Sequence, residues 1–327
     1  MANLSTRFFG LDLKSPVIAA SSSMTGHAEQ VIKLAEAGAG AIVLKSIFEE
    51  EIYLELQEEL SQRSSLHADP EYLDYFDYVI KEENIKKYLK LISEVKARTN
   101  VPIVASINCV SSGEWVLFAR KIEEAGADAL ELNMFVYPEV YKSGENDEQF
   151  YFDTITKVLQ VVKIPVSIKI SHYFTNLPGI VQKLSQTGIS GITIFNRFYS
   201  PDIDIQSQTV VVSDVLSLPD DYILPLRWTG ILSGILSCDL AATTGIHTSE
   251  SALKFLLAGA SAIQIASVLY IEGPLAITRM NNEIAHWMDQ KGYTNLSDFR
   301  GLLSQTSSST QAWGRVQFMK YFGEKAF

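Results

Sequence analysis

The chain has 327 residues, 47% of them hydrophobic, and a formal net charge of −11 from 27 basic and 38 acidic residues. This hydrophobic content is enough for a large core, and the acidic balance argues against a nucleic-acid partner, which needs a basic surface. Two cysteines are too few to hold an iron–sulfur cluster, and the lack of an apolar leader or membrane-length apolar run predicts a cytoplasmic protein without membrane association.

Strand and helix signals alternate along the chain. Apolar, β-branched runs of about 4–8 residues predict buried parallel strands, and the longer stretches between them that stop at glycine predict helices. The strands are expected at 16–21, 41–45, 101–108, 129–133, 164–170, 191–196, 239–243 and 262–266, and the helices at 27–37, 84–98, 113–125, 150–162, 177–186, 249–258 and 276–291.

A short Ala-Gly-Ala motif recurs between a predicted helix end and the next strand, at 37–41, 125–129 and 258–262. Small residues there let a helix end pack closely on a barrel, so the motif indicates a repeated βα unit. Eight such units favour a (β/α)8 TIM barrel, although an open doubly wound sheet is built from the same units. We expect a single barrel domain over residues 1–327.

Two insertions interrupt this alternation, after the second and the sixth predicted strands. The first, 47–83, is rich in glutamate and tyrosine, and the second, 198–230, contains the alternating segment DIDIQSQTVVV, which predicts a hairpin. Long loops on this face of a barrel often form lids or dimer surfaces. Both insertions are therefore candidates to cover a ligand.

Five predicted strands end at or close to a lysine or an asparagine, and a TIM barrel keeps its active site where its strands end. Lysines there stabilise negative charge or, when their pKa is depressed, form Schiff bases, and a structural ion pair is the alternative. Asparagines bind the edges of flat heterocycles, or else satisfy loop backbone groups. The five residues are Lys45, Asn108, Asn133, Lys169 and Asn196.

The segment Thr243-Thr244-Gly245-Ile246 lies between the seventh strand and its helix, where barrels commonly bind phosphate. Ala266 and Ser267, after the eighth strand, would complete that phosphate site. None of the five histidines has metal-ligand spacing, so no metal is expected.

Taken in order, several of these segments resemble the dihydroorotate dehydrogenase family, nearest to its soluble class 1 enzymes. The resemblance covers most of the chain and depends on the order and spacing of the segments, since no one of them is decisive. They are SPVIAASS at 15–22, GAGAIVLKS at 38–46, DALELN at 128–133, PVSIKI at 165–170, IFN at 194–196, TTGI at 243–246 and AGASAIQIASVLYIEGP at 258–274.

The resemblance implies an FMN-binding barrel, homodimeric, that acts on a small molecule in pyrimidine biosynthesis. Its lysine near flavin N1, here Lys169, stabilises the anionic reduced flavin. By the same resemblance, Ala20, Ser21 and Ser22 lie against the isoalloxazine ring, Lys45 and Ser46 lie between flavin and substrate, and Asn133 and Asn196 contact flavin or substrate. The resemblance also implies that Thr229 and Gly230 lie near the phosphate or ribityl chain, and that the phosphate is held by Thr244, Gly245, Ala266 and Ser267. Asn108 is a further cofactor-binding candidate.

The chain departs from the family on the substrate side. Val136 stands where class 1 enzymes carry a cysteine base, and Ser64–Tyr72 replaces the family's longer substrate loop. Thr244 also stands where a glycine is usual. A different general base would then be needed, with Tyr137, His172 and His67 as the candidates.

The functional hypothesis is therefore an FMN-dependent oxidoreductase that oxidises dihydroorotate or a related small acid. The hydride would pass to flavin N5, and the electrons to a soluble acceptor such as fumarate. Two alternatives stay open: a flavin-binding protein without dihydroorotate activity, and a Schiff-base lyase that uses Lys169 or Lys45.

Overall fold

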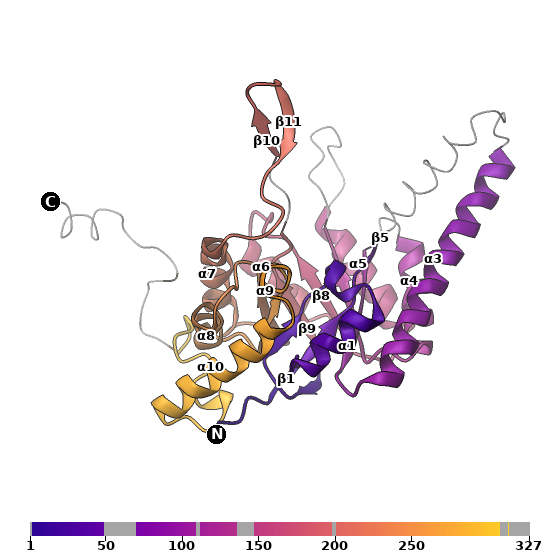
Figure 1. Cartoon of the computed structure of the whole chain (residues 1–327). Helices are drawn as coiled ribbons and strands as arrows, with labels where there is room; N and C mark the ends of the chain where they lie inside the picture. The colour runs from indigo at the N-terminus through magenta and orange to yellow at the C-terminus, as the bar shows by residue number, and fades with distance from the viewer. Residues whose placement is uncertain are drawn as a thin grey trace.

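The computed structural model describes residues 2–48, 70–108, 112–135, 147–197, 201–307 and 313. Within them, eight parallel strands form a closed sheet: β3 (Val17–Ala19), β4 (Ala41–Val43), β6 (Ile103–Asn108), β7 (Ala129–Asn133), β8 (Val166–Ile170), β9 (Gly191–Ile194), β12 (Asp239–Thr243) and β13 (Ala262–Ile265). They follow one another around the axis in chain order, and the β4–β6 pairing closes the ring. The predicted (β/α)8 barrel is thereby confirmed (Figure 1).

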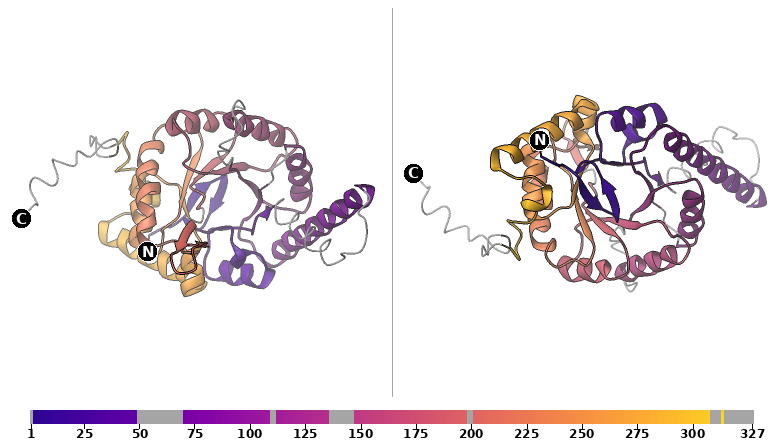
Figure 2. Two further views of the ribbon diagram at one scale, coloured as in Figure 1. Left: turned by 90° about the horizontal axis from the view of Figure 1, so that it is seen from above. Right: turned by 90° about the horizontal axis from the view of Figure 1, so that it is seen from below.

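Helices connect successive strands and surround them as a ring, which Figure 2 shows from both ends of the barrel. Residues that follow one another on each strand alternate between the barrel axis and this ring of helices. The helices are α1 (Ala28–Glu36), α3 (Pro70–Arg98), α4 (Ser112–Glu124), α5 (Asp147–Leu159), α6 (Leu177–Ser185), α7 (Ile223–Leu232), α8 (Ser249–Ala258), α9 (Ser267–Glu272) and α10 (Leu275–Lys291).

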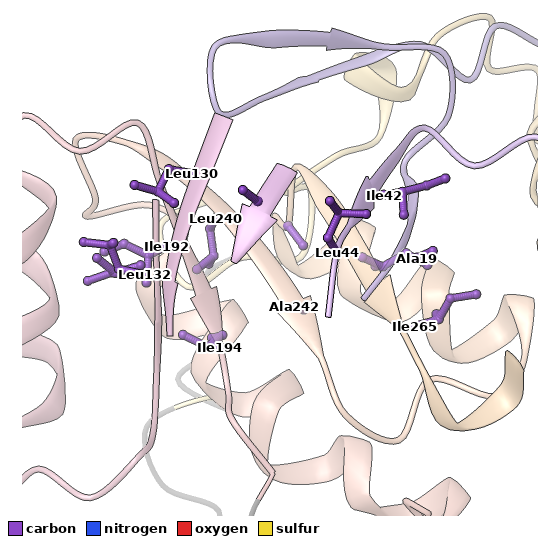
Figure 3. Close-up of a cluster of buried hydrophobic side chains, with 14 of the residues drawn as sticks. Ala19, Ile42, Leu44, Leu130, Leu132, Ile192, Ile194, Leu240, Ala242 and Ile265 are labelled. Atoms are coloured by element: carbon purple, nitrogen blue, oxygen red, sulfur yellow. The ribbon is translucent and has the colours of Figure 1, made fainter. Parts of the chain in front are cut away.

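The main hydrophobic core lies between the strands and the helices. Its strand residues include Leu130 and Leu132 of β7, which are fully buried together with Ile192 and Ile194 of β9 (Figure 3). Burial of one such side chain contributes about 1.5–3 kcal/mol. Because every strand supplies at least one of these residues and most supply two or three, the apolar runs of the sequence are explained by this outer face of the sheet.

A second apolar cluster fills the N-terminal end of the barrel. The hairpin of β1 (Thr6–Phe8) and β2 (Leu11–Leu13) lies across this end, as the right-hand view in Figure 2, from below, shows. Phe8 and Phe9 are buried against small inward-facing residues such as Ala129. A Cβ at Gly191 would lie only 2.9 Å from the Phe9 ring. The hairpin therefore closes this end and leaves the other, C-terminal end for a site.

Both insertions leave the C-terminal end of the barrel. The first contains β5 (Ile47–Phe48) and the start of α3, which begins at Pro70 and not at 84 as expected. In the second, β10 (Pro201–Asp204) and β11 (Thr209–Val212) pair as an antiparallel hairpin, so this prediction is confirmed. The insertion is shorter than expected, because its last residues, 223–230, belong to α7.

The sequence interpretation missed α7 because the helix contains Pro225 and Gly230, two residues that normally oppose a helix. Pro225 lies in the first turn, where its missing N–H leaves no hydrogen bond unmade.

Among the described residues, no helix is both long enough and apolar enough to cross a bilayer.

Candidate functional site

Each strand of the barrel places one predicted residue at its C-terminal end, on the side opposite the β1–β2 hairpin. Because the strands are parallel and the ring is closed, these residues form a circle around one opening. The structure therefore brings the predicted strand-end residues together. In order around the ring they are Ala20, Lys45, Asn108, Asn133, Lys169, Asn196, Thr244 and Ala266.

The barrel interior beneath this circle is polar. In β7, Ala129 belongs to the inner cluster, while Leu130 and Leu132 belong to the outer core, so Glu131 points toward the axis. TIM barrel interiors are normally filled by branched apolar side chains, and an unpaired buried polar group is costly. A polar interior therefore indicates function. The inward-facing polar residues include Ser106, Glu131, Ser167, Lys169, Thr193 and Gln264.

Lys169 is a basic side chain of this region. Burial lowers its pKa, and the charge of Glu131 acts in the opposite direction and raises it. Asn196 fixes the backbone beside it: its main-chain N–H donates to Ile170 O at 2.8 Å, and its Nδ2 donates to Lys169 O at 3.3 Å. The ends of β8 and β9 are thus tied together at the predicted cofactor residues.

A chain of hydroxyl groups joins three neighbouring strand ends. Ser21 Oγ lies 3.0 Å from Ser46 Oγ, which lies 2.7 Å from the fully buried Ser106 Oγ. The backbone N–H of Ser46 also donates to Ser21 Oγ at 2.9 Å. Tyr88 of α3 fixes the Ser106 backbone, with which it exchanges hydrogen bonds of 2.8 and 3.2 Å. These contacts hold Ser21 and Ser46, two predicted cofactor residues, in one geometry.

The loop after β12 contains two successive residues with positive φ angles. Thr244 has φ = 79° and Gly245 has φ = 72°. A β-branched residue in this left-handed region is strained, and such residues gather at functional sites. The hydroxyl of Thr244 donates to Phe195 O at 3.2 Å, which holds this conformation in place. Gly245 is required, because a Cβ there would overlap the backbone N of Tyr222.

The second insertion is fastened next to this loop. Ser217 N donates to Ser267 Oγ at 2.9 Å, and Ser217 Oγ lies 3.0 Å from His247 Nε2. Arg197 donates to the carbonyl groups of Asp214 and Val215, at 2.9 and 2.7 Å. Residues 213–222 therefore lie against the ends of β12 and β13, beside the predicted phosphate site.

Comparison with known proteins shows the family to which the chain belongs. The sequence model of the family described as Dihydroorotate dehydrogenase matches residues 76–288. The chain belongs to the dihydroorotate dehydrogenase family. Its members catalyse oxidation at a CH–CH donor and are flavoproteins, so this protein is an oxidoreductase of the dihydroorotate dehydrogenase type.

Curated members of the family match over nearly their full length. The dihydroorotate dehydrogenase B (NAD(+)) catalytic subunit of Thermoplasma volcanium is 26% identical over 316 residues, which cover 92% of this chain and 99% of the relative. The protein of the same name from Anoxybacillus flavithermus is 26% identical, with 92% and 96% covered. A relative from Aeropyrum pernix, whose name gives fumarate as acceptor, is 25% identical, with 91% and 96% covered.

Two of the residues assigned by resemblance lie away from the strand ends. Thr229 and Gly230 are in α7, where Thr229 Oγ1 donates to Pro225 O within the helix at 2.8 Å. A Cβ at Gly230 would lie 2.6 Å from the Trp313 ring, so this glycine packs against Trp313. The structure therefore does not bring this pair into the circle of strand-end residues.

The structure describes one of the three candidate bases and not the other two. Val136, Tyr137 and His67 lie outside the described residues, and so do positions 64–69 of the substituted substrate loop. His172 is described: it follows β8, burial lowers its pKa, and its ring lies 5.7 Å from that of Phe195. Of the three candidate bases, His172 is thus the one that the structure describes, and it follows a strand end.

Sequence reasoning missed the residues inside the barrel. Glu131, Thr193 and Gln264 form a buried hydrogen-bonded group, yet each was counted as part of an apolar strand. A usable signal was present, because each of them interrupts an apolar run at a position two residues from a small residue that faces the axis. Ser217 was missed because nothing in its local sequence indicates a contact with Ser267, 50 residues away.

Proposed function

We propose that this member of the dihydroorotate dehydrogenase family uses FMN, bound at the C-terminal end of its barrel, to oxidise dihydroorotate or a related small acid. The observation that carries the proposal is the circle of lysine and asparagine side chains above a buried polar interior that contains Lys169. Asparagine matches the hydrogen-bonding edges of an isoalloxazine ring, and a nearby cation favours its reduced form.

The residues present fit FMN at both of its ends. At the phosphate end, the strained Thr244 and the glycine that follows it turn the backbone beside Ala266 and Ser267. At the ring end, Ser22 carries a buried hydroxyl group that has no hydrogen-bond partner among the described residues. A polar group left unpaired in this way is costly, and a bound ligand would satisfy it. When bound, FMN would supply the hydride acceptor.

The protein side chains would bind and orient flavin and substrate, and would neutralise negative charge on the reduced flavin. Lys169 would place positive charge beside the flavin, and Asn133 and Asn196 would fix the plane of flavin or substrate. Lys45 would lie between flavin and substrate. Its aliphatic chain packs against Gly26, because a Cβ built on that glycine would lie 3.6 Å from Lys45 Cβ. Tyr137 remains a proposed catalytic residue on the strength of the sequence alone.

We further propose a soluble electron acceptor. Fumarate is one candidate, and NAD(+) reached through a partner subunit is the other, since relatives carry either name. We also propose a cytoplasmic location, where such acceptors are available.

A homodimer is also proposed, as the resemblance implies. The β10–β11 hairpin offers apolar surface for it, because Ile203, Val210 and Val212 are each more than 60% exposed (65%, 74% and 63%). Light scattering of the wild type and of Val210→Asp tests this proposal.

Titration of the flavin-free protein with FMN tests the cofactor site. Asn133→Ala should weaken FMN binding by about 1–3 kcal/mol, roughly tenfold or more, because an edge of the ring loses its partner. Thr156→Ala is the matched control, since it removes a hydroxyl group from the outer helix α5 and should leave FMN affinity unchanged. Equal affinities for the wild type and Asn133→Ala would place FMN elsewhere.

Anaerobic addition of dihydroorotate to the FMN-loaded protein then tests the substrate. Bleaching of the flavin colour identifies dihydroorotate as a substrate. A flavin that stays oxidised with dihydroorotate, and is reduced by another small acid, assigns the related acid. A flavin that no such acid reduces would contradict the proposed oxidation.

A further inference from the structure

Three side chains from alternate strands form one buried group inside the barrel. Glu131 Oε2 accepts a hydrogen bond from Gln264 Nε2 at 2.7 Å and one from Thr193 Oγ1 at 3.2 Å. Gln264 Nε2 is also 3.1 Å from Thr193 Oγ1. All three residues are fully buried. A carboxylate in such a place normally needs a cation, because the two neutral partners leave its charge uncompensated.

The nearest candidate for that cation is Lys169. It lies on β8, between the strands of Glu131 and Thr193, and the strand register places it directly beside Thr193. Glu131 lies opposite Ser167, one inward-facing position deeper than Lys169. Lys169 is therefore beside Thr193 and one inward-facing position above Glu131, toward the strand ends.

Two features of the interior connect Lys169 with Glu131. Burial lowers the pKa of Lys169, and the Glu131 charge is what opposes this and raises it. In addition, Glu131 Oε1 has no hydrogen-bond partner among the described residues, so one oxygen of the carboxylate is open. Without the Glu131 charge, desolvation would act on Lys169 unopposed and favour its neutral amine.

We propose that Glu131 is a positioning residue for Lys169: held by Gln264 and Thr193, its carboxylate keeps the Lys169 ammonium charged, and so strengthens the binding of reduced over oxidised FMN. The inference rests on the proposed function and extends it to a residue below the site. Glu131 does not touch the flavin in this proposal and acts through Lys169 alone.

This proposal predicts a change of sign that a direct effect would not give. An anion that acted on the flavin by itself would disfavour the reduced form, so its removal would raise the midpoint potential. An anion that keeps Lys169 charged has the opposite effect, and its removal lowers the potential. A residue that only joins strands would change stability and leave the potential of the folded protein unchanged.

The first measurement uses the flavin-free protein. Lysine side chains are labelled with 13C, the Lys169 resonance is assigned by its loss in Lys169→Met, and its pKa is measured by NMR. Glu131→Gln should lower the pKa of Lys169 by about 1–3 units relative to the wild type. Ser167→Ala is the matched control: it removes from β8, the strand of Lys169, a buried hydroxyl group that has no hydrogen-bond partner in the described part of the chain, and it should leave this pKa unchanged.

The second measurement is the midpoint potential of FMN bound to the wild type, Glu131→Gln, Lys169→Met and the double variant. Glu131→Gln should lose about tenfold in the affinity for reduced relative to oxidised FMN, a fall of about 30 mV for a two-electron couple. In the Lys169→Met background, the same substitution should not lower the potential further. Thr193→Val, which removes one hydrogen bond and no charge, should have a smaller effect than Glu131→Gln.

The possible results separate this inference from the proposed function. A wild type that takes up no FMN overturns the proposed function, whereas an unchanged pKa of Lys169 in Glu131→Gln overturns the coupling on which the inference depends. A potential that rises in Glu131→Gln, or that falls equally with and without Lys169, also overturns the inference. Circular dichroism of each variant confirms that the comparison is made between folded proteins.

Discussion

Gly245 offers a sharp test of the loop that is proposed to hold the FMN phosphate. With φ = 72°, it occupies the left-handed region, which costs an alanine about 1–2 kcal/mol. A Cβ would also overlap the backbone N of Tyr222 and lie 2.7 Å from the carbonyl carbon of Asp221. Because these atoms are backbone, they cannot rotate away, and overpacking of this kind costs about 1–3 kcal/mol more. Gly245→Ala should therefore destabilise the protein by about 2–5 kcal/mol.

Gly292 supplies the matched control. Its φ of 76° imposes the same backbone strain, but nothing lies within 4 Å of a Cβ built there. Gly292→Ala should therefore cost only the strain, about 1–2 kcal/mol. Urea unfolding followed by tryptophan fluorescence measures both variants, and an FMN titration should show weaker binding for Gly245→Ala alone. Equal losses of stability would refute the close approach of residues 221 and 222 to this loop.

Three further predictions concern the strained loop, the barrel bottom and a buried carboxyl group. Thr244→Gly should be more stable than Thr244→Ala by about 0.5–1 kcal/mol in urea unfolding, because only glycine adopts φ = 79° without strain; the reverse order would show that position 244 is not strained. Gly191→Ala should destabilise by about 1–3 kcal/mol, since its Cβ would lie 2.9 Å from Phe9, and should leave FMN affinity unchanged; weaker FMN binding would contradict a purely structural role. Burial raises the pKa of Asp239, more than Arg300 lowers it, so stability is lost as pH rises through the folded-state pKa. Asp239→Asn should therefore raise the urea midpoint at pH 7 and give no gain at pH 3, where the carboxyl group is neutral in both states, and a gain at both pH values would refute this cause.

The sequence was sufficient to predict the barrel because its strands are nearly continuous apolar runs. Those runs cover the outer face, where residues such as Leu130 and Ile192 pack against helices. The predicted bounds of β7, β12 and α8 agree with the structure, since each of these elements ends at a clear polar or glycine signal. The strand-end residues could be predicted for the same reason, because a parallel barrel collects all such ends on one face.

The interior of the barrel could not be predicted in the same way. The partners of Glu131 lie 62 and 133 residues away in the sequence, and only the closed register brings them together. The β1–β2 hairpin was missed because Phe8 and Phe9 show no long apolar run, although they close the barrel. The placement of Thr229 and Gly230 followed the resemblance and not the local pattern, and α7 holds them in the helical layer. The extent of the domain over 1–327 stays a prediction.

The visible spectrum of the purified protein after incubation with FMN tests the central claim most directly. We expect a flavin absorption band near ~450 nm that survives gel filtration at about one FMN per chain, because the strand-end circle and the loop at Thr244 bind the two ends of the cofactor. A protein that stays colourless after this treatment would contradict the FMN site.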